Sequence, residues 1–235
     1  MIDFQYHSPN SLEEAFELLD RYGDDARVMA GGTALGLQMK QRLARPDHVI
    51  GLRRIPGLTE IQWEANGQTS GQLRVGAMTT QQQIETSQLV KDSIPLFASA
   101  LRQASTPRIR SMATLGGGLV HGDPNQDPPP ALIALGAQAV IRSSAGERVV
   151  LVEDLFIDYF ETDLRSGEIM TDIIIPAPPA GSGSVYLKFL PRTADDYATV
   201  SVAAVVTKGE GNICQEIRIV LGAVGVTPVR ATDAE

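Results

Sequence analysis

Two glycine-rich segments constrain the fold of this chain more than any other feature of its sequence. The first, Ala30-Gly31-Gly32-Thr33, follows an apolar run and precedes a stretch with helical spacing. The second, which we expect to be a loop, runs from Thr114 to Gly118 and contains three consecutive glycines. Glycine has no Cβ, so each segment presents backbone amides to a close neighbour, beside a threonine hydroxyl. Two such segments can hold the pyrophosphate of a dinucleotide between them, although an isolated Gly-Gly-Thr can also be a simple tight turn.

Neither segment fits the two most familiar nucleotide-binding patterns. A phosphate-binding loop ends in Gly-Lys followed by Ser or Thr, and a nicotinamide site of the Rossmann type requires Gly-x-Gly-x-x-Gly after a first strand. Both patterns are missing from the two segments. The sequence therefore points to a dinucleotide site of another kind.

Composition excludes several other classes of protein. The 235 residues are 43% hydrophobic and 20% charged, which is typical of a compact globular fold. A formal charge of -8 disfavours nucleic-acid binding, because a phosphate backbone requires clustered Lys and Arg. The single cysteine, Cys214, excludes a disulfide framework and a cysteine-ligated metal site, and we expect it to be buried in a strand. No signal sequence and no apolar run near twenty residues is present, so we expect a cytoplasmic location without a transmembrane segment.

Alternating strands and helices are expected in the N-terminal part of the chain. Ser11 with Glu14 has the pattern of a helix N-cap, and the helix should end near Gly23. The other expected elements are a buried strand at 26–30, a helix at 34–43, a strand at 48–52, and a hairpin of strands 62–65 and 73–77 across Asn66-Gly67.

The rest of the chain is expected to be helical first and then rich in strands. Helical spacing covers 80–105 with a break at Pro95, and Asp127-Pro128 opens an apolar helix. Strands are expected at 139–143, 148–151 and 172–176, followed by a linker at 176–184 and three strands at 185–190, 200–208 and 213–223.

A few polar residues are candidates for ligand contacts. Asp127 can accept hydrogen bonds from ribityl hydroxyls or can merely stabilise the N-terminus of its helix. Lys188 and Arg192 can reach a phosphate or a reduced flavin, or can form surface salt bridges with Asp195 and Asp196. The three histidines are too scattered along the sequence to predict a metal site or a nucleophile–base pair. Trp63 is expected to pack against neighbours.

The order of four motifs resembles the FAD-binding medium subunits of the xanthine dehydrogenase and carbon monoxide dehydrogenase family of molybdenum hydroxylases. The motifs are Val28 to Leu35, Thr114 to Gly118, His121 to Asp127, and Lys188 with Arg192 and 195–198. The resemblance covers nearly the whole chain.

The resemblance implies an α+β fold. This is the two-subdomain FAD-binding fold of the PCMH, or vanillyl-alcohol-oxidase-like, type, followed by a C-terminal sheet domain. The implied divisions are an N-terminal FAD-binding subdomain at 1–56, a second one at 57–177 and the C-terminal domain at 178–235. That last domain is expected to be incomplete, because the chain ends near Arg230, short of the family's helical end.

The resemblance assigns cofactor binding, and neither a catalytic residue nor a metal ligand, to this chain. The implied FAD contacts are Val28, Met29, Ala30, Gly31, Gly32, Thr33, Ala34, Leu35, Ala104, Thr114, Leu115, Gly116, Gly117, Gly118, Asp127, Ile169, Met170 and Lys188. Two positions depart from the family pattern. Gly118 stands where the family usually has Asn, and Ala34 stands where many members have Ser or Asp, so two side-chain hydrogen bonds to the cofactor are lost.

The function implied is electron transfer within a larger enzyme. A large molybdopterin-binding subunit oxidises the substrate, a small subunit with 2Fe–2S clusters passes on the electrons, and the FAD of this chain delivers them to an external acceptor. The implied assembly is a heterotrimer or a dimer of heterotrimers. Two alternatives stay open: an FAD-free scaffold subunit, and a self-contained flavin oxidoreductase of the same superfamily. Flavin content and co-purifying subunits discriminate among the three.

Overall fold

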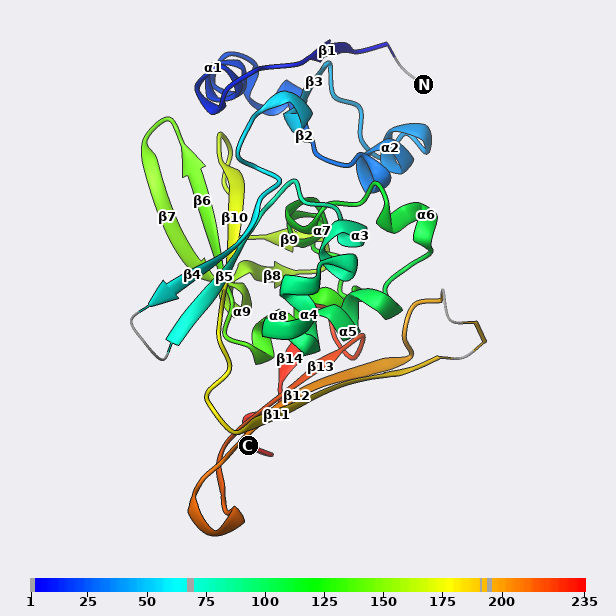
Figure 1. Cartoon of the computed structure of the whole chain (residues 1–235). Helices are drawn as coiled ribbons and strands as arrows, with labels where there is room; N and C mark the ends of the chain where they lie inside the picture. The colour runs from blue at the N-terminus through cyan, green and yellow to red at the C-terminus, as the bar shows by residue number, and fades with distance from the viewer. Residues whose placement is uncertain (1–2, 67–69, 191, 194–195) are drawn as a thin grey trace.

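The computed structural model describes residues 3–66, 70–190, 192–193 and 196–235. It has the α+β architecture that the sequence predicts, with three main sheets arranged along the molecule (Figure 1). A small N-terminal unit lies at the top of the view, a five-stranded sheet with helices beside it lies in the middle, and a four-stranded sheet lies at the bottom. Among the described residues, no helix is long and apolar enough to cross a membrane.

The N-terminal unit is a three-stranded parallel sheet with two helices. Its strands run in the order β1 (Gln5–His7), β3 (His48–Gly51) and β2 (Ala26–Met29). Helix α1 (Leu12–Tyr22) begins at Ser11, whose hydroxyl accepts the amide of Glu14, as predicted. Its buried face consists of Ala15, Phe16 and Leu19, so the helix has the amphipathic pattern of one that packs on a sheet. Helix α2 (Thr33–Lys40) follows directly after the first glycine segment.

The middle unit is an antiparallel sheet in the order β4, β5, β10, β6 and β7. The strands are β4 (Ile61–Asn66), β5 (Ser70–Gly76), β10 (Ile169–Pro176), β6 (Gln138–Ser143) and β7 (Gly146–Leu151). The helices are α3 (Gln81–Thr86), α4 (Gln88–Ser93), α5 (Pro95–Gln103), α6 (Pro107–Arg110), α7 (Leu115–His121), α8 (Pro128–Ala134) and α9 (Val152–Leu155). A short hairpin, β8 (Phe156–Asp158) with β9 (Glu161–Thr162), completes the unit.

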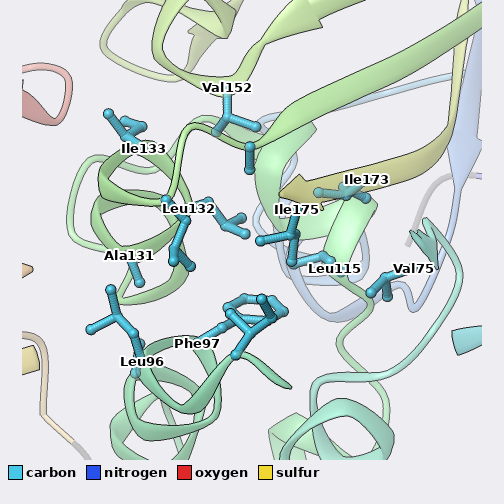
Figure 2. Packing of buried hydrophobic residues seen from close by; sticks show 14 of the residues in the cluster. Val75, Leu96, Phe97, Leu115, Ala131, Leu132, Ile133, Val152, Ile173 and Ile175 are labelled. Atoms are coloured by element: carbon cyan, nitrogen blue, oxygen red, sulfur yellow. The ribbon is translucent and has the colours of Figure 1, made fainter. Parts of the chain in front are cut away.

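The main hydrophobic core lies between this sheet and its helices. Phe97 of α5 and Leu132 of α8 face Ile173 and Ile175 of β10, and all four are fully buried (Figure 2). Leu115 of α7 joins the same cluster. Burying large side chains of this kind contributes roughly 1.5–3 kcal/mol each, so the core holds the helices in fixed positions on the sheet.

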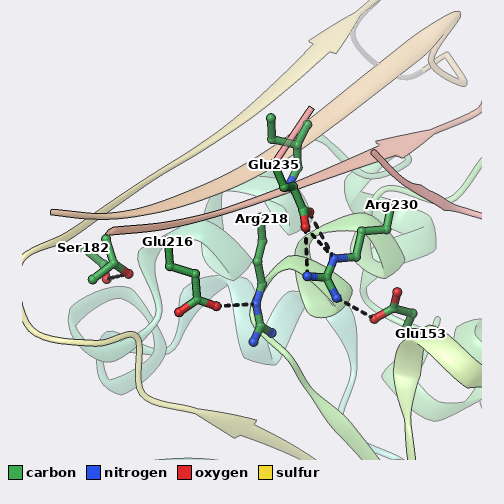
Figure 3. Close-up of polar contacts among 8 residues, drawn as sticks. Glu153, Ser182, Glu216, Arg218, Arg230 and Glu235 are labelled. Atoms are coloured by element: carbon green, nitrogen blue, oxygen red, sulfur yellow. Dashed lines mark hydrogen bonds and ion pairs between the residues drawn. The ribbon is translucent and has the colours of Figure 1, made fainter. Parts of the chain in front are cut away.

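The C-terminal sheet is antiparallel, in the order β11 (Ser182–Phe189), β12 (Val200–Lys208), β13 (Cys214–Gly222) and β14 (Val229–Arg230). Its inner face packs on the helices of the middle unit through Tyr186, Ala203 and Val220. At the end of the sheet, Arg230 bridges Glu235 and Glu153, which belong to the C-terminus and to α9 (Figure 3).

Several expectations about local structure need correction. The expected linker at 176–184 is partly ordered, because β11 already begins at Ser182. Cys214 is exposed at the first position of β13, where the register with β12 shifts, and is therefore not the buried residue expected from alternation. Trp63 packs against a neighbour as expected, although it is 40% exposed: its indole lies over Gly71 of the adjacent strand β5, whose missing side chain leaves room for the ring. The hairpin strands β4 and β5 are confirmed, but Gly67 in its expected turn lies outside the described residues.

Candidate functional site

A cavity of about 690 Å³ lies where the N-terminal unit meets the middle unit. Its walls come from the turn between β2 and α2, from the segment between α5 and α8, and from β10 and β11. The chain thus brings residues more than 150 positions apart to one site. All residues assigned to cofactor binding by resemblance line it, except Met29 and Leu115. Leu115 belongs instead to the hydrophobic core.

The first glycine segment lies at the start of α2 and opens onto the cavity. Gly32 adopts the left-handed conformation, with φ of 74°, and is the N-cap residue of α2. A Cβ on Gly31 would collide with the carbonyl oxygen of Met112, so only glycine allows this close approach. No side chain in the described part of the chain caps α2, so the amides of its first turn keep their hydrogen-bonding capacity, and the positive end of the helix dipole faces the cavity.

The second glycine segment is a helix rather than the loop that the sequence suggested. Thr114 is the N-cap of α7, and its Oγ1 accepts the amide of Gly117 at 3.2 Å. The amides of Leu115, Gly116 and Gly118 donate to Thr79, Ala77 and Thr114 oxygens at 2.8–3.0 Å. The amides of residues 115–118 therefore already have acceptors within the protein.

The second segment therefore contributes to the cavity through the missing side chains of its glycines, which allow close packing. A Cβ on Gly117 would stand 3.1 Å from the Cβ of Ala30 and 2.7 Å from Thr114 Oγ1. The two glycine segments thus lie against each other, although more than eighty residues separate them in the sequence. This close packing forms one end of the cavity.

A buried polar cluster also contributes to the cavity wall. Asp127 accepts a hydrogen bond from the Tyr186 hydroxyl at 2.6 Å and from Lys188 Nζ at 3.0 Å. Lys188 Nζ also donates to the Gln103 carbonyl oxygen at 2.8 Å. The side chain of Lys188 is 1% exposed and that of Asp127 is 6% exposed. Such a pair is stable only when most of its hydrogen-bonding capacity is used, as it is here.

This cluster shows which protein groups the two charged side chains contact. Asp127 does not cap α8 through its side chain, because both of its oxygens are directed at β11. Lys188 pairs with Asp127 and not with surface aspartates; Asp195 lies outside the described residues. Arg192 is exposed and is not part of the cavity wall.

Burial changes the proton affinities in this wall. Desolvation raises the pKa of Asp127 above 3.8, against the opposing effects of the Tyr186 hydrogen bond and of Lys188. Burial and the neighbouring Asp127 also raise the pKa of Tyr186, which therefore stays a neutral donor. Tyr197, which donates to Asp123 Oδ2 at 2.9 Å near the cavity mouth, has its pKa raised to about 12 by burial and then by Asp123.

Gly118 shows how the cavity wall compensates for a missing side chain. The Nε2 of Gln126 donates to the Gly118 carbonyl at 2.8 Å, and a Cβ on Gly118 would stand 2.8 Å from Gln126 Oε1. A side chain at 118 would compete for this space with the carboxamide of Gln126. Sequence reasoning missed Gln126 and Gln81 as individual cavity residues, since only the tertiary structure brings them to Gly118.

Two of the three histidines lie close together in the structure, although they are far apart in the sequence. His7 Nε2 and His48 Nδ1 are 3.0 Å apart on adjacent parallel strands, and Tyr22 stacks on His48 with ring centroids 3.6 Å apart. The pair lies outside the cavity wall. Within the described ranges, no group of three or more His, Cys, Asp or Glu side chains is placed to hold a metal ion.

Family profiles match almost the whole chain. The profile described as "FAD binding domain in molybdopterin dehydrogenase" matches residues 2–178. A second, described as "CO dehydrogenase flavoprotein C-terminal domain", matches residues 185–235. The chain therefore contains an FAD-binding domain.

Individual proteins agree with the profiles. The chain is 38% identical to the carbon monoxide dehydrogenase medium chain of Hydrogenophaga pseudoflava over 227 residues, which is 97% of this chain and 77% of that protein. It is 36% identical to the nicotine 6-hydroxylase medium subunit of Paenarthrobacter nicotinovorans over 98% of this chain and 78% of that one.

Solved structures share the same fold. A chain of the cyanide-inactivated Cu,Mo-CO dehydrogenase crystal structure superposes with a TM-score of 0.92 at 38% identity, covering 100% of this chain and 80% of that one. A chain of quinoline 2-oxidoreductase from Pseudomonas putida 86 gives 0.91 at 34% identity, with 100% and 79% coverage. The chain belongs to the family of FAD-binding medium subunits of molybdenum hydroxylases, which are parts of oxidoreductase complexes.

Proposed function

We propose that this chain holds FAD in the cavity between its first two units and passes electrons from the 2Fe–2S clusters of a partner subunit through the flavin to an external acceptor. The observation that carries the proposal is the convergence of the α2 N-terminus, the glycine contact with α7 and the Asp127–Lys188 pair on one cavity. Its volume of about 690 Å³ lies within the range of sites for cofactor-sized ligands.

The residues present fit a dinucleotide. The amides and dipole at the start of α2 suit the pyrophosphate, and Gly31 and Gly32 allow the close approach that this requires. Gln81 is only 8% exposed, and its Oε1 has no hydrogen-bond partner among the described residues. A buried oxygen without a partner in a cavity wall suits a polar ligand.

Other lining residues suit the flavin ring. Ile169 and Met170 of β10 are apolar and reach the cavity, as does Ala104. Lys188 adds a cation and Asp127 a carboxyl group to the lining of the same cavity. We propose that the apolar residues pack against the ring and that this charged pair sets the electrostatic environment of its polar edge. Val28, Thr33, Ala34, Leu35, Thr114 and the glycines at 116–118 complete the proposed cofactor contacts.

Bound FAD supplies the redox chemistry, since it accepts electrons singly or in pairs. The chain itself needs no acid–base dyad for this task. Its residues bind and orient the flavin, exclude water from one side, and hold Asp127 between two donors so that its carboxyl group keeps one orientation. The proposed partners are a large molybdopterin-binding subunit and a small 2Fe–2S subunit. We also propose the domain boundaries 1–56, 57–177 and 178–235.

The visible absorption spectrum of the purified chain, with and without added FAD, tests the cofactor part of this proposal. Flavin bands and release of FAD on denaturation are expected. A folded, colourless chain that fails to take up FAD would contradict the assignment of the cavity.

Electron transfer is tested in the assembled complex. Anaerobic addition of the reducing substrate to the complex should bleach both the cluster bands and the flavin bands. The same complex stripped of FAD should bleach only at the clusters and should no longer reduce the external acceptor. Bleaching of the flavin in a chain without its partners would favour a self-contained oxidoreductase.

A further inference from the structure

The turn between α5 and α6 holds a serine in an unfavourable conformation at the cavity wall. Ser105 has a φ of 41°, in the left-handed region that non-glycine residues rarely adopt. Both Ser105 and its neighbours Ala104 and Thr106 line the cavity. A strained residue persists only where surrounding contacts hold it.

A buried arginine provides those contacts. The Nη1 atom of Arg110 donates to the carbonyl oxygens of Ala104 and Ser105, at 2.7 Å each. Its Nε donates to Glu85 Oε2 at 2.8 Å, and the arginine is only 9% exposed. The guanidinium group is planar and rigid, so it fixes both carbonyls, and with them the direction of the Ser105 side chain.

The hydroxyl that this arrangement presents has no partner in the protein. Ser105 Oγ is buried and makes no hydrogen bond with the described residues. Burying a hydroxyl without a hydrogen-bond partner destabilises the folded protein. Ser105 therefore combines two destabilising features, the unpartnered hydroxyl and the strained backbone. Ser105 as a whole is half-buried and lines the cavity, so rotation about its Cα–Cβ bond is the route by which the hydroxyl would reach a bound ligand.

We infer that Ser105 is a further cofactor contact, with its hydroxyl hydrogen-bonded to a polar atom of FAD, and that Arg110 is the positioning residue that holds it there. This inference rests on the proposed function of the cavity. A hydroxyl both donates and accepts, so it fits a carbonyl oxygen or ring nitrogen of the flavin, or a hydroxyl of either sugar.

The substitution Ser105→Ala separates a ligand contact from a structural one. It removes only the oxygen, so the apoprotein should unfold at the same temperature as wild type or higher, since an unsatisfied buried group is lost. The Kd for FAD should rise roughly tenfold, because the cofactor atom loses its partner. A hydroxyl with a purely structural role would lower the stability of the apoprotein instead.

Thr79→Val is the matched control. Thr79 Oγ1 is also buried and unpartnered among the described residues, but Thr79 does not line the cavity. This variant should likewise keep or raise apoprotein stability, while its Kd for FAD stays at the wild-type value. Ser105→Gly should relieve the strain at the positive φ, stabilise the apoprotein, and weaken FAD binding to the same extent as Ser105→Ala.

Titration of fluorescence with FAD, riboflavin and ADP measures these effects. A weaker affinity of Ser105→Ala for FAD together with either riboflavin or ADP supports the inference and assigns the contact to that half. Unchanged affinity for FAD overturns the inference, as does a marked loss of apoprotein stability. Failure of the wild-type chain to bind FAD would instead contradict the proposed function, so the two failures are distinguishable.

Discussion

At the scale of single residues, the buried pair of Lys188 and Asp127 has the largest predicted effect on stability. Lys188→Met should destabilise the protein by about 3–5 kcal/mol at neutral pH, because Asp127 is left buried without its cation. The deficit should shrink toward acid pH, since the pKa of Asp127 is already raised by burial and its neutral form needs no cation.

Urea unfolding of this variant at several pH values checks the prediction. The double variant Asp127→Asn with Lys188→Met should recover part of the lost stability, because no charge then remains buried. A single variant as stable as wild type at neutral pH would show that the pair is not buried in solution.

The two neighbouring histidines predict a pH dependence of their own. The pKa of His7 is lowered from 6.5, first by desolvation and then by the charges of His48 and Arg21. The folded state therefore binds fewer protons than the unfolded state below pH 6.5. The contribution of His7 to the free energy of unfolding is therefore fully present above pH 6.5. It is lost as the pH falls from 6.5 toward the lower pKa that His7 has in the folded state.

His7→Gln is the variant that tests this pH dependence. Its urea midpoint should fall less than that of wild type when the pH is lowered from 7.5 to 5.5. Equal slopes for the two proteins would contradict the lowered pKa of His7 in the folded state.

Residue types could be predicted from the sequence better than their partners could. The glycines, Asp127 and Lys188 were all identified as candidates, and all line one cavity. The bond between Asp127 and Lys188 could not be predicted, because only the packing of the C-terminal sheet on the middle unit brings Lys188, on a strand that was expected, to Asp127. The contact of His7 with His48 was missed for the same reason, since parallel pairing of β1 and β3 alone makes it.

At the scale of elements, the contact between the β2–α2 turn and α7 predicts the effect of a larger side chain. Gly117→Val should push Ala30 and Thr114 away, separate the two glycine segments and abolish retention of FAD. Gly183→Val is the matched control, because nothing lies within 4 Å of the added Cβ and a β-branched residue suits strand β11.

Flavin content per folded chain, with circular dichroism as the test of folding, measures the outcome. The control should retain flavin at the wild-type level. A folded Gly117→Val protein with normal flavin content would show that α7 is not part of the proposed pyrophosphate site.

Most element types followed from periodicity, but one helix and the exposure of one strand residue depended on tertiary contacts. The helix of the second glycine segment was missed, because three consecutive glycines have low helical propensity and favour a loop. In the structure the Thr114 hydroxyl and the carbonyls of Ala77 and Thr79 fix this helix from outside. The exposure of Cys214 was missed because alternation fails where the register of β13 shifts.

At the scale of the whole molecule, the outward face of the C-terminal sheet is apolar. Val185, Leu187 and Phe189 alternate along β11 and are 45%, 61% and 64% exposed. Leu187 pairs with Val202 and Val185 pairs with Ala204 of β12, so the surface continues across strands. Contiguous apolar surfaces of this kind favour association.

Concentration-dependent self-association of the purified chain is therefore expected in sedimentation velocity. Leu187→Lys with Phe189→Lys should abolish it, while Ile213→Lys, which changes an isolated residue that is 70% exposed, should leave it unchanged. A wild-type chain that stays monomeric across the concentration range would contradict this prediction.

The hydrogen bonds from β11 to Asp127 restrict how such chains can be recombined. Lys188 of the C-terminal sheet lines a cavity that is built mostly by earlier residues, and both Lys188 and Tyr186 of the same strand donate to Asp127 in its wall. A chimera that exchanges this sheet with that of a relative must therefore inherit a compatible aspartate, tyrosine and lysine together. Recombination near residue 180 can exchange the C-terminal sheet as a folded unit, but the ligand site depends on side chains from both sides of this junction. Natural recombination at this point should therefore preserve the three side chains as one set.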